Sequence, residues 1–573
     1  MKRRDFIKNM GLFATTISPV ARIGGALGLG SVTTALSAQE FGDYKAIVIF
    51  DMDGGNDAMN MFSPTTPTTH ATYKEIRTNL GVELYEKNDD GEYTDELSDL
   101  YGDDNYAVNE TTQHFTGSLG ANQPYLVEEG EHGSEDGKEA MYIKGSYHTK
   151  KPDGTDTGLG IHALMPEIAS LYNKGVLSIA SNTGVLIEPV TKEEIEDESV
   201  RLPGFLFSHG NQRELIATLQ AGQAGGKSGW AGRLADEWLL KDSLGLNISY
   251  GGVTKTFMGL ATSGLTMSTR GPTSYQSYST MGENFEKVLE NFDTNATDTN
   301  IFDRFTNKIN AKTAGLSIDL NNAWEDAPIF ASEVKDSDNN VKDETYPDVN
   351  NSYGDPLFTV YSGNESTREN LGIRTHHGLD KRIFEQLEAT AKTIKVSQTG
   401  DLAANRQIFY VRQAGHDVHG NQADSHSRLM RGVSLAVSDF YKALEAMGLE
   451  KDVLLVSLSE FGRTIKSNSD GTDHGWGGHS FMMCGDESFN GGNVFGDVLT
   501  DLSLEGDNAY TNRARIIPTT SIEQMLAPAL KWFGVDDAIM AEVLPNLANF
   551  RDPEDLGNVE SAFLEGVFSE VVV

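Results

Sequence analysis

Cysteine is almost absent from this chain: its 573 residues include one, Cys484. A single thiol excludes an intrachain disulfide, a zinc site of four thiolates and a paired-thiol redox motif. Positive charge is also scarce, and the formal net charge is -38. Such a surface repels nucleic acid and anionic lipid, so we expect neither as a partner. An anionic ligand would need a local positive centre, such as a metal ion.

Long apolar runs are missing beyond the N-terminal segment, so we expect no membrane span in the mature chain. Residues 3–8 read RRDFIK, which matches a twin-arginine export signal, and a stretch rich in Gly, Ala and Thr follows to about Ala38. We therefore predict a signal peptide over 1–38, a partnership with the twin-arginine translocase during export, and a periplasmic or secreted protein. A basic amphipathic N-terminal helix is the alternative. Folding before export fits the lack of disulfides.

Apolar, β-branched runs alternate with amphipathic segments along the mature chain. This alternation favours an α/β fold, with a doubly wound, mostly parallel sheet flanked by helices. The expected strands are 45–50, 176–180, 407–411, 453–458 and 480–483, and the expected helices are 162–172, 208–220, 379–396 and 429–447.

One domain is expected over residues 39–551, interrupted by two polar segments. Residues 88–156 and 251–355 are rich in Asp, Asn and other polar residues with weak periodicity, so we interpret them as insertions into this domain. Residues 552–573 are acidic with apolar spots and are interpreted as a tail or an edge element.

Carboxylate and imidazole side chains gather at the boundaries of the expected strands. Because parallel strands bring their C-terminal ends to one edge of a sheet, groups at these ends should converge. Such side chains are ligands for zinc, manganese and similar divalent ions. The alternative is a set of loop caps and satisfied surface histidines. The candidates are Asp53, Asn56, Asp57, His416, Asp417, His419, His426, Glu460, Asp473, His474 and His479.

Ser208 and His209 stand at the start of an expected helix. A helix N-terminus stabilises an anion through its free N–H groups and its dipole, and a hydroxyl beside a metal can act as a nucleophile. Serine is also a preferred N-cap, so a purely structural role for Ser208 is the alternative.

Several segments together resemble a family of exported proteins known as domain of unknown function 1501, placed in the alkaline-phosphatase-like (sulfatase-like) superfamily. They occur in family order over nearly the whole mature chain. The segments are 53–60 (DGGNDAMN), 160–164 (GIHAL), 207–212 (FSHGNQ), 229–234 (GWAGRL), 417–422 (DVHGNQ), 459–463 (SEFGR) and 472–479 (TDHGWGGH); the last three are the most specific.

The resemblance implies an alkaline-phosphatase-like fold and a divalent metal site, with zinc as a candidate. It implies Ser208 as the nucleophile, and metal ligands at Asp53, Asp417, His419, Glu460 and either His474 or His479. Two departures leave open whether one of two metal sites is remodelled or missing. The Asp417/His419 pair is closer in sequence than the superfamily's usual pair, and Phe461 follows Glu460 where the superfamily usually has His.

The function implied is an exported metal-dependent hydrolase of phosphate esters, acting on a small-molecule or polymer ester. Sulfate esters are less favoured, because no Ser/Cys-x-Pro-x-Arg segment occurs and Cys484 is followed by Gly-Asp-Glu. The alternative is a non-catalytic exported protein that keeps the fold as a binding or assembly module, with a surface polymer or an unknown protein as its partner.

Overall fold

The computed structural model describes residues 41–82, 108–109, 114–115, 146–162, 164–222, 228–238, 245–271, 323–324, 349, 357–358, 379–398 and 402–569. The expected signal peptide lies outside the described residues, and so do most of the two expected polar insertions. Among the helices of this described part, none combines the length and the apolarity needed to cross a membrane.

The strand β1 (Lys45–Asp53) lies at the centre of the main sheet. Its β-branched run packs apolar side chains on both faces, as a central strand requires, and five consecutive residues from Ala46 are buried. It pairs in parallel with β10 (Arg406–Ala414) on one side and with β11 (Val453–Leu458) on the other. All three strands end at the same edge.

Within the described residues the sheet has nine strands and is mixed, with mostly parallel pairs. Its order is β15-β7-β14-β11-β1-β10-β8-β9, and β18 pairs with β7. Only β14 pairs in the antiparallel sense, with β11 and β7. The predicted strands near 45–50, 176–180, 407–411 and 453–458 all lie in this sheet, which confirms that prediction. The predicted strand near 176–180 is β7 (Leu177–Gly184), and the further members are β8 (Asn247–Ser249), β9 (Leu265–Thr266), β14 (Gly478–Met483), β15 (Val494–Phe495) and β18 (Thr520–Ser521).

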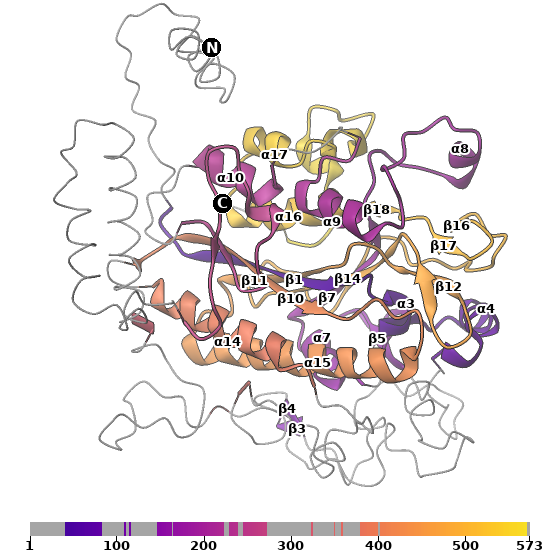
Figure 1. The fold of residues 1–573 in the computed structure, drawn as a ribbon, viewed down its shortest axis with the longest axis horizontal. Helices are drawn as coiled ribbons and strands as arrows, with labels where there is room; N and C mark the ends of the chain where they lie inside the picture. Colours follow the sequence, from indigo (N-terminus) through magenta and orange to yellow (C-terminus); the bar gives the residue numbers. More distant parts are fainter. Residues whose placement is uncertain are drawn as a thin grey trace, which may run out of the picture.

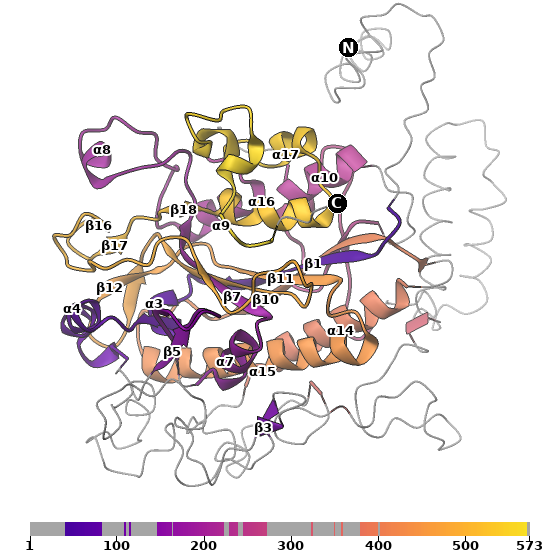
Figure 2. The ribbon, with the colours of Figure 1, turned by 180° about the vertical axis from the view of Figure 1, so that it is seen from behind.

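Helices cover both faces of the sheet (Figure 1). The helices α7 (Pro166–Asn173), α14 (Lys381–Val396) and α15 (Gln422–Met447) cover one face, and the view from behind in Figure 2 shows the same layers. The helices α9 (His209–Thr218), α10 (Trp230–Trp238), α16 (Ile522–Phe533) and α17 (Asp537–Val543) cover the other. Alternate side chains of β1 enter two separate cores, Val48 on the α15 side and Ile47 on the α16 side.

Some elements differ from the sequence predictions at their ends. The helix α15 begins at Gln422, seven residues before the predicted start, because its first turns carry polar residues that obscure the apolar period. His162 ends a strand, β6 (Asp156–His162), and α7 begins only at Pro166, a residue favoured in the first turn.

Described parts of the expected insertions and tail belong to ordered structure. The strands β2 (Phe62–Pro64), β6 and β5 (Ser146–Lys150) form a three-stranded sheet, and β9 extends the main sheet. After Asp552 the chain returns to the core on the α16 side of the sheet, where Ala562 and Val567 are buried.

Short elements complete the described fold. They are α3 (Ala58–Met61), α4 (Pro67–Arg77), η1 (Thr78–Leu80), β3 (Val108–Asn109), β4 (His114–Phe115), α8 (Lys192–Glu196), η2 (Lys255–Phe257), β12 (Arg463–Ser467), β13 (Thr472–His474), β16 (Ala509–Tyr510), β17 (Arg515–Ile516), η5 (Leu547–Phe550) and η6 (Val559–Ala562).

Candidate metal centre

The turn after β1 packs tightly against the loop after β10. Gly54 in this turn has a φ of +121°, and a Cβ atom there would lie 2.4 Å from the backbone nitrogen of Asp417. Only glycine combines this conformation with so close an approach. The Gly-rich turn thus allows the loop that carries Asp417 and His419 to lie over the carboxyl end of the sheet.

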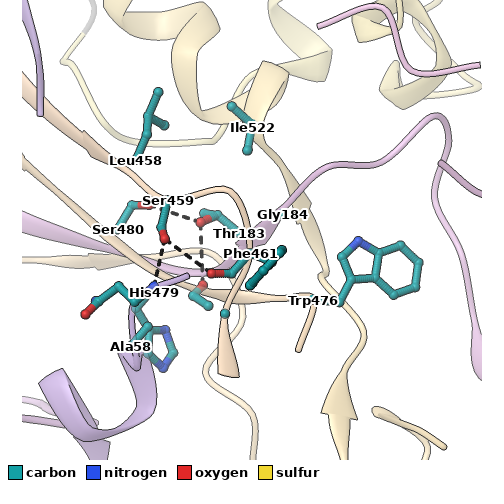
Figure 3. A pocket seen from close by; sticks show the side chains of 13 residues that line it. Ala58, Thr183, Gly184, Leu458, Ser459, Phe461, Trp476, His479, Ser480 and Ile522 are labelled. Carbon is teal, nitrogen blue, oxygen red and sulfur yellow. Dashed lines mark hydrogen bonds between the residues drawn. The ribbon is translucent and has the colours of Figure 1, made fainter. Parts of the chain in front are cut away.

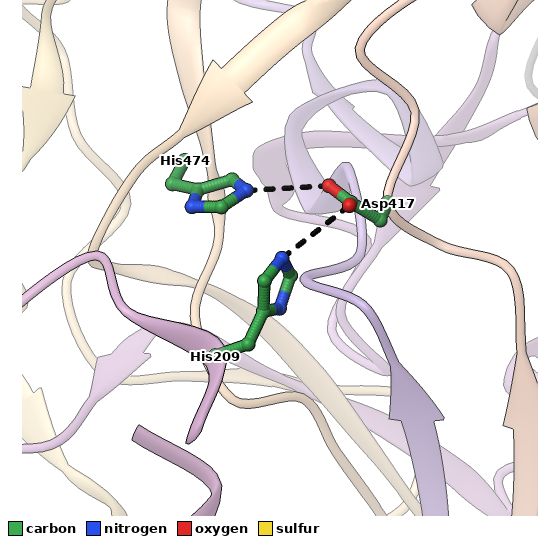
Figure 4. Close-up of side chains that lie close together, drawn as sticks. All are labelled: His209, Asp417 and His474. Atoms are coloured by element: carbon green, nitrogen blue, oxygen red, sulfur yellow. Dashed lines mark hydrogen bonds and ion pairs between the residues drawn. The ribbon is translucent and has the colours of Figure 1, made fainter. Parts of the chain in front are cut away.

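Four side chains converge there, which we call the four-residue cluster: His209, Asp417, His419 and His474. His209 begins α9, Asp417 and His419 come from the loop between β10 and α15, and His474 ends β13. Ligand atoms of His209, Asp417 and His474 all lie within 4.8 Å of one another (Figure 4).

Each histidine of the cluster directs its Nε2 toward the carboxylate of Asp417. The Nε2 to oxygen distances are 3.4 Å for His209, 3.2 Å for His474 and 3.0 Å for His419. The Nε2 atoms of His419 and His474 are 2.8 Å apart. His209, His474 and Asp417 therefore offer two imidazole nitrogens and one carboxylate around a common point, and His419 Nε2 lies beside them, next to Asp417 and His474.

The opposite nitrogen of each ring, Nδ1, faces an oxygen acceptor. The acceptors are Glu460 Oε1 at 2.9 Å for His209, Asp473 Oδ1 at 3.3 Å for His419 and the backbone oxygen of Phe207 at 2.7 Å for His474. A ring that donates its Nδ1–H to such an oxygen keeps the lone pair on Nε2. Oxygen acceptors behind metal-bound histidines do the same and fix the ring orientation.

The surroundings of the cluster favour an ionised Asp417 and neutral His419 and His474. Burial is the largest single influence on Asp417 and opposes its ionisation, but the hydrogen bond from Arg463 Nη2 at 2.6 Å, the charge of Arg463 and the nearby histidines together lower the pKa of this carboxyl group. Burial lowers the pKa values of His419 and His474, and the nearby charge of Arg463 lowers both further. These are the protonation states in which the two residue types bind metal ions.

Glu460 and Asp53, both predicted as metal ligands, lie beside the cluster in other roles. The carboxylate of Glu460 is buried and accepts from the backbone N–H of Gly54 and from Arg213 Nε, besides facing His209. Asp53 is paired with Arg213, at 2.6 Å from Nη2, and with Arg412. Glu460 thus orients the ring of His209, while Asp53 is paired with two guanidinium groups.

A second group of histidines, the buried histidine pair, consists of His416 and His426. Both rings contact the same atom, Asn56 Oδ1, at 3.0 Å. Burial lowers the pKa of His426 to about 4 and holds that of His416 well below its usual range. Nearby, Asp57 is buried and paired with Arg77. These candidates belong to the structural core of the turn.

His479 and Ser208 also stand apart from the cluster. His479 is buried beside a cavity of only about 20 Å³ (Figure 3). Its Nδ1 lies 3.3 Å from Ser181 Oγ and 3.2 Å from the backbone nitrogen of Asn182. Ser208 occupies the N-cap position of α9, but its side chain makes no capping hydrogen bond and instead accepts from Asn211 Nδ2 at 3.0 Å. Asp473 supports His419, as described above.

Three arginines were missing from the sequence-based candidates: Arg213, Arg412 and Arg463. Arg463 lies in the SEFGR segment, which could have suggested it. Arg412 could have been found from the alternation of side chains along a strand. It lies opposite Asp51 on the neighbouring strand, so it shares a face of the sheet with Asp51 and Asp53. Arg213 lies one helical turn after His209, so it returns to the same side of α9.

Residues 386–538 match the model of the family described as Protein of unknown function (DUF1501). This match supports the family resemblance over the part of the chain that carries Asp417, His419, Glu460 and His474. No curated protein matches the chain.

Proposed function

We propose that this protein binds one divalent transition-metal ion, such as zinc, through His209, Asp417, His419 and His474. The arrangement of the three rings carries the proposal: every Nδ1 faces an oxygen, and every Nε2 faces Asp417. Three imidazoles and a carboxylate match the donor preference of zinc and related ions.

The reaction that we propose is hydrolysis of a phosphate ester, with sulfate esters less favoured, by an exported, periplasmic or secreted enzyme on an alkaline-phosphatase-like frame. A divalent ion supplies a Lewis acid for the ester oxygen. Arg463 holds Asp417 ionised and in place, and Glu460 fixes the ring of His209. Ser208 precedes His209 directly and is the candidate nucleophile, with a water molecule as the alternative.

A second candidate function is a non-catalytic binding or assembly module. The observation that favours it is the pairing of Asp53 with Arg213 and Arg412. A two-metal hydrolase needs carboxylates for both ions, and here the Asp53 carboxylate is already neutralised. A protein that keeps one ion for structure or for binding a polymer or partner would not need it.

Metal analysis of the purified mature protein tests the first proposal. We expect about one equivalent of a divalent metal, which His419→Ala should reduce strongly because it removes one ligand from a half-exposed position. His479→Gln is the matched control and should retain the metal, since His479 lies outside the cluster. Metal-free wild type, or equal metal content in both variants, would contradict the metal site.

Activity then separates the two functions. Chromogenic phosphate and sulfate esters should be hydrolysed by the metal-loaded protein and not after chelation, with Ser208→Ala testing the nucleophile. A protein that holds its metal but hydrolyses none of these esters would favour the binding module.

A further inference from the structure

A cavity of about 330 Å³ lies directly beside the four-residue cluster. Its wall includes Glu460, which orients His209, and also Gly210 and Arg213 from the same helix. This volume is in the range of sites for small organic molecules. A ligand bound at the cluster could therefore extend into this cavity.

A second cavity, of about 300 Å³, shares one lining residue with the first, Arg412. The neighbouring residues Gly252 and Val253 line the second and the first cavity, respectively. Arg412 therefore lies at the border of the two cavities. The first cavity is bordered by Glu460 and Arg213 beside the cluster and by Arg412 beside the second cavity.

The backbone of Arg412 is held in place at the border of the two cavities. Gln386 fixes its backbone with two hydrogen bonds, at 2.8 Å to the N–H and 3.0 Å to the carbonyl oxygen. Among the described residues, the side chain donates a hydrogen bond only to Asp53, through Nη2, and it is 38% exposed. A guanidinium group carries five N–H donors, so most of them are available to a ligand.

Other charges along the first cavity are matched within the protein. Lys255 is paired with Glu214, and Asp53 faces two arginines at once. Asp51, in the same wall, accepts a hydrogen bond from the Tyr410 hydroxyl, and burial raises its pKa to about 7. The apolar side chains of Ile49, Trp230 and Leu458 complete the wall. The lining therefore suits an organic group that ends in an oxyanion more than a bare inorganic ion.

We infer that Arg412 binds an oxyanion, such as a carboxylate, on the part of the substrate that is distant from the scissile ester. This inference rests on the proposed function, because it takes the cluster as the site of the ester. It assigns the two cavities to an extended substrate that carries at least two anionic groups. A planar guanidinium group matches a carboxylate in two parallel hydrogen bonds.

Titration calorimetry with non-hydrolysable phosphonates tests this subsite on the metal-loaded mature protein. The probes are phenylphosphonate and its 4-carboxy derivative, together with the matching biphenyl pair to allow for a longer reach. We expect at least one carboxylated probe to bind about tenfold tighter than its parent, the scale of a charge-assisted hydrogen bond. Arg412→Met should abolish this preference and leave the affinity for the parent compound unchanged.

Arg201→Met is the matched control, because Arg201 is also paired with a carboxylate but lies on an exposed loop. It should keep the preference for the carboxylated probe. Equal binding of parent and carboxylated probes by the wild type would overturn the inference, as would a preference that survives in Arg412→Met.

A second arm separates this outcome from failure of the metal site. Benzoate is titrated into chelator-treated wild type and Arg412→Met, where the metal plays no part. Weaker binding to the variant, by about fivefold or more, supports the subsite even if metal analysis finds no ion. Binding that is absent or independent of Arg412 in this arm overturns the subsite, whatever the metal content.

Discussion

The four-residue cluster and the buried histidine pair lie next to each other, yet their rings are used in different ways. In the pair, the rings of His416 and His426 both contact Asn56 and are fully buried. In the cluster, Nδ1 faces an oxygen, while Nε2 converges with its neighbours on a partly exposed carboxylate. What separates a candidate ligand from a core histidine is therefore the placement of its second nitrogen.

The largest expected effect falls on the buried pair. Asn56→Ala should lower the free energy of unfolding by about 3 kcal/mol, because two buried rings lose the oxygen that both contact. Urea denaturation measures this loss, with the exposed Asn79→Ala as the control. The comparison breaks down if Asn56→Ala unfolds at the same urea concentration as the control.

The buried pair should also make the folded protein less stable as the pH is lowered. The pKa of His426 is lowered from the usual 6.5 to about 4, chiefly by burial, with the charge of Asp57 opposing the shift and those of Arg77 and Arg463 adding to it. The unfolded chain then binds a proton between these values while the folded chain does not. The contribution is complete above pH 6.5 and is lost as the pH falls toward 4.

Denaturation at pH 7.5 and pH 5 checks this slope in the wild type and in His426→Gln. The variant should lose less stability between the two values than the wild type does. Identical losses would show that this ring is not held neutral by the fold.

Loss of the acceptor that faces Nδ1 of a cluster histidine should lower metal affinity and hardly change the free energy of unfolding. Asp473→Ala removes the acceptor of His419 Nδ1, and we expect metal affinity to fall about 10- to 100-fold. Competition with a chromogenic chelator measures this affinity. Asp507→Ala, at an exposed position in the turn before β16, is the control and should bind as the wild type does; equal affinities in the two variants would contradict the supporting role of Asp473.

The smallest effect is expected at Ser208. Its side chain makes no capping hydrogen bond, so Ser208→Ala should cost less than the roughly 1 kcal/mol of a typical N-cap loss. The side chain of Ser521 caps α16 by accepting a hydrogen bond from the Gln524 N–H, so Ser521→Ala should show the full loss of stability in thermal denaturation. If Ser208 is the nucleophile, its variant loses turnover while keeping both stability and metal. A stability loss equal to that of Ser521→Ala would indicate a structural role instead.

The sequence by itself determined the α/β class and indicated the edge of the sheet where the candidate residues lie. The runs around β1, β10 and β11 are apolar because both faces of a central strand are covered, and that pattern is visible without a structure. The ends of parallel strands meet at one edge by geometry alone. For this reason Asp417, His419 and His474 could be expected near one another from their positions along the chain.

Only the tertiary structure decided which of the candidates converge. Asp53 and Glu460 stand at strand ends as Asp417 does, but arginines and backbone N–H groups reach them from distant segments. The rotation of each histidine ring is likewise set by acceptors such as Glu460 and Phe207, which lie far away in sequence. Residue type and spacing carry no record of these long-range partners, because each depends on how the loops pack over the completed sheet.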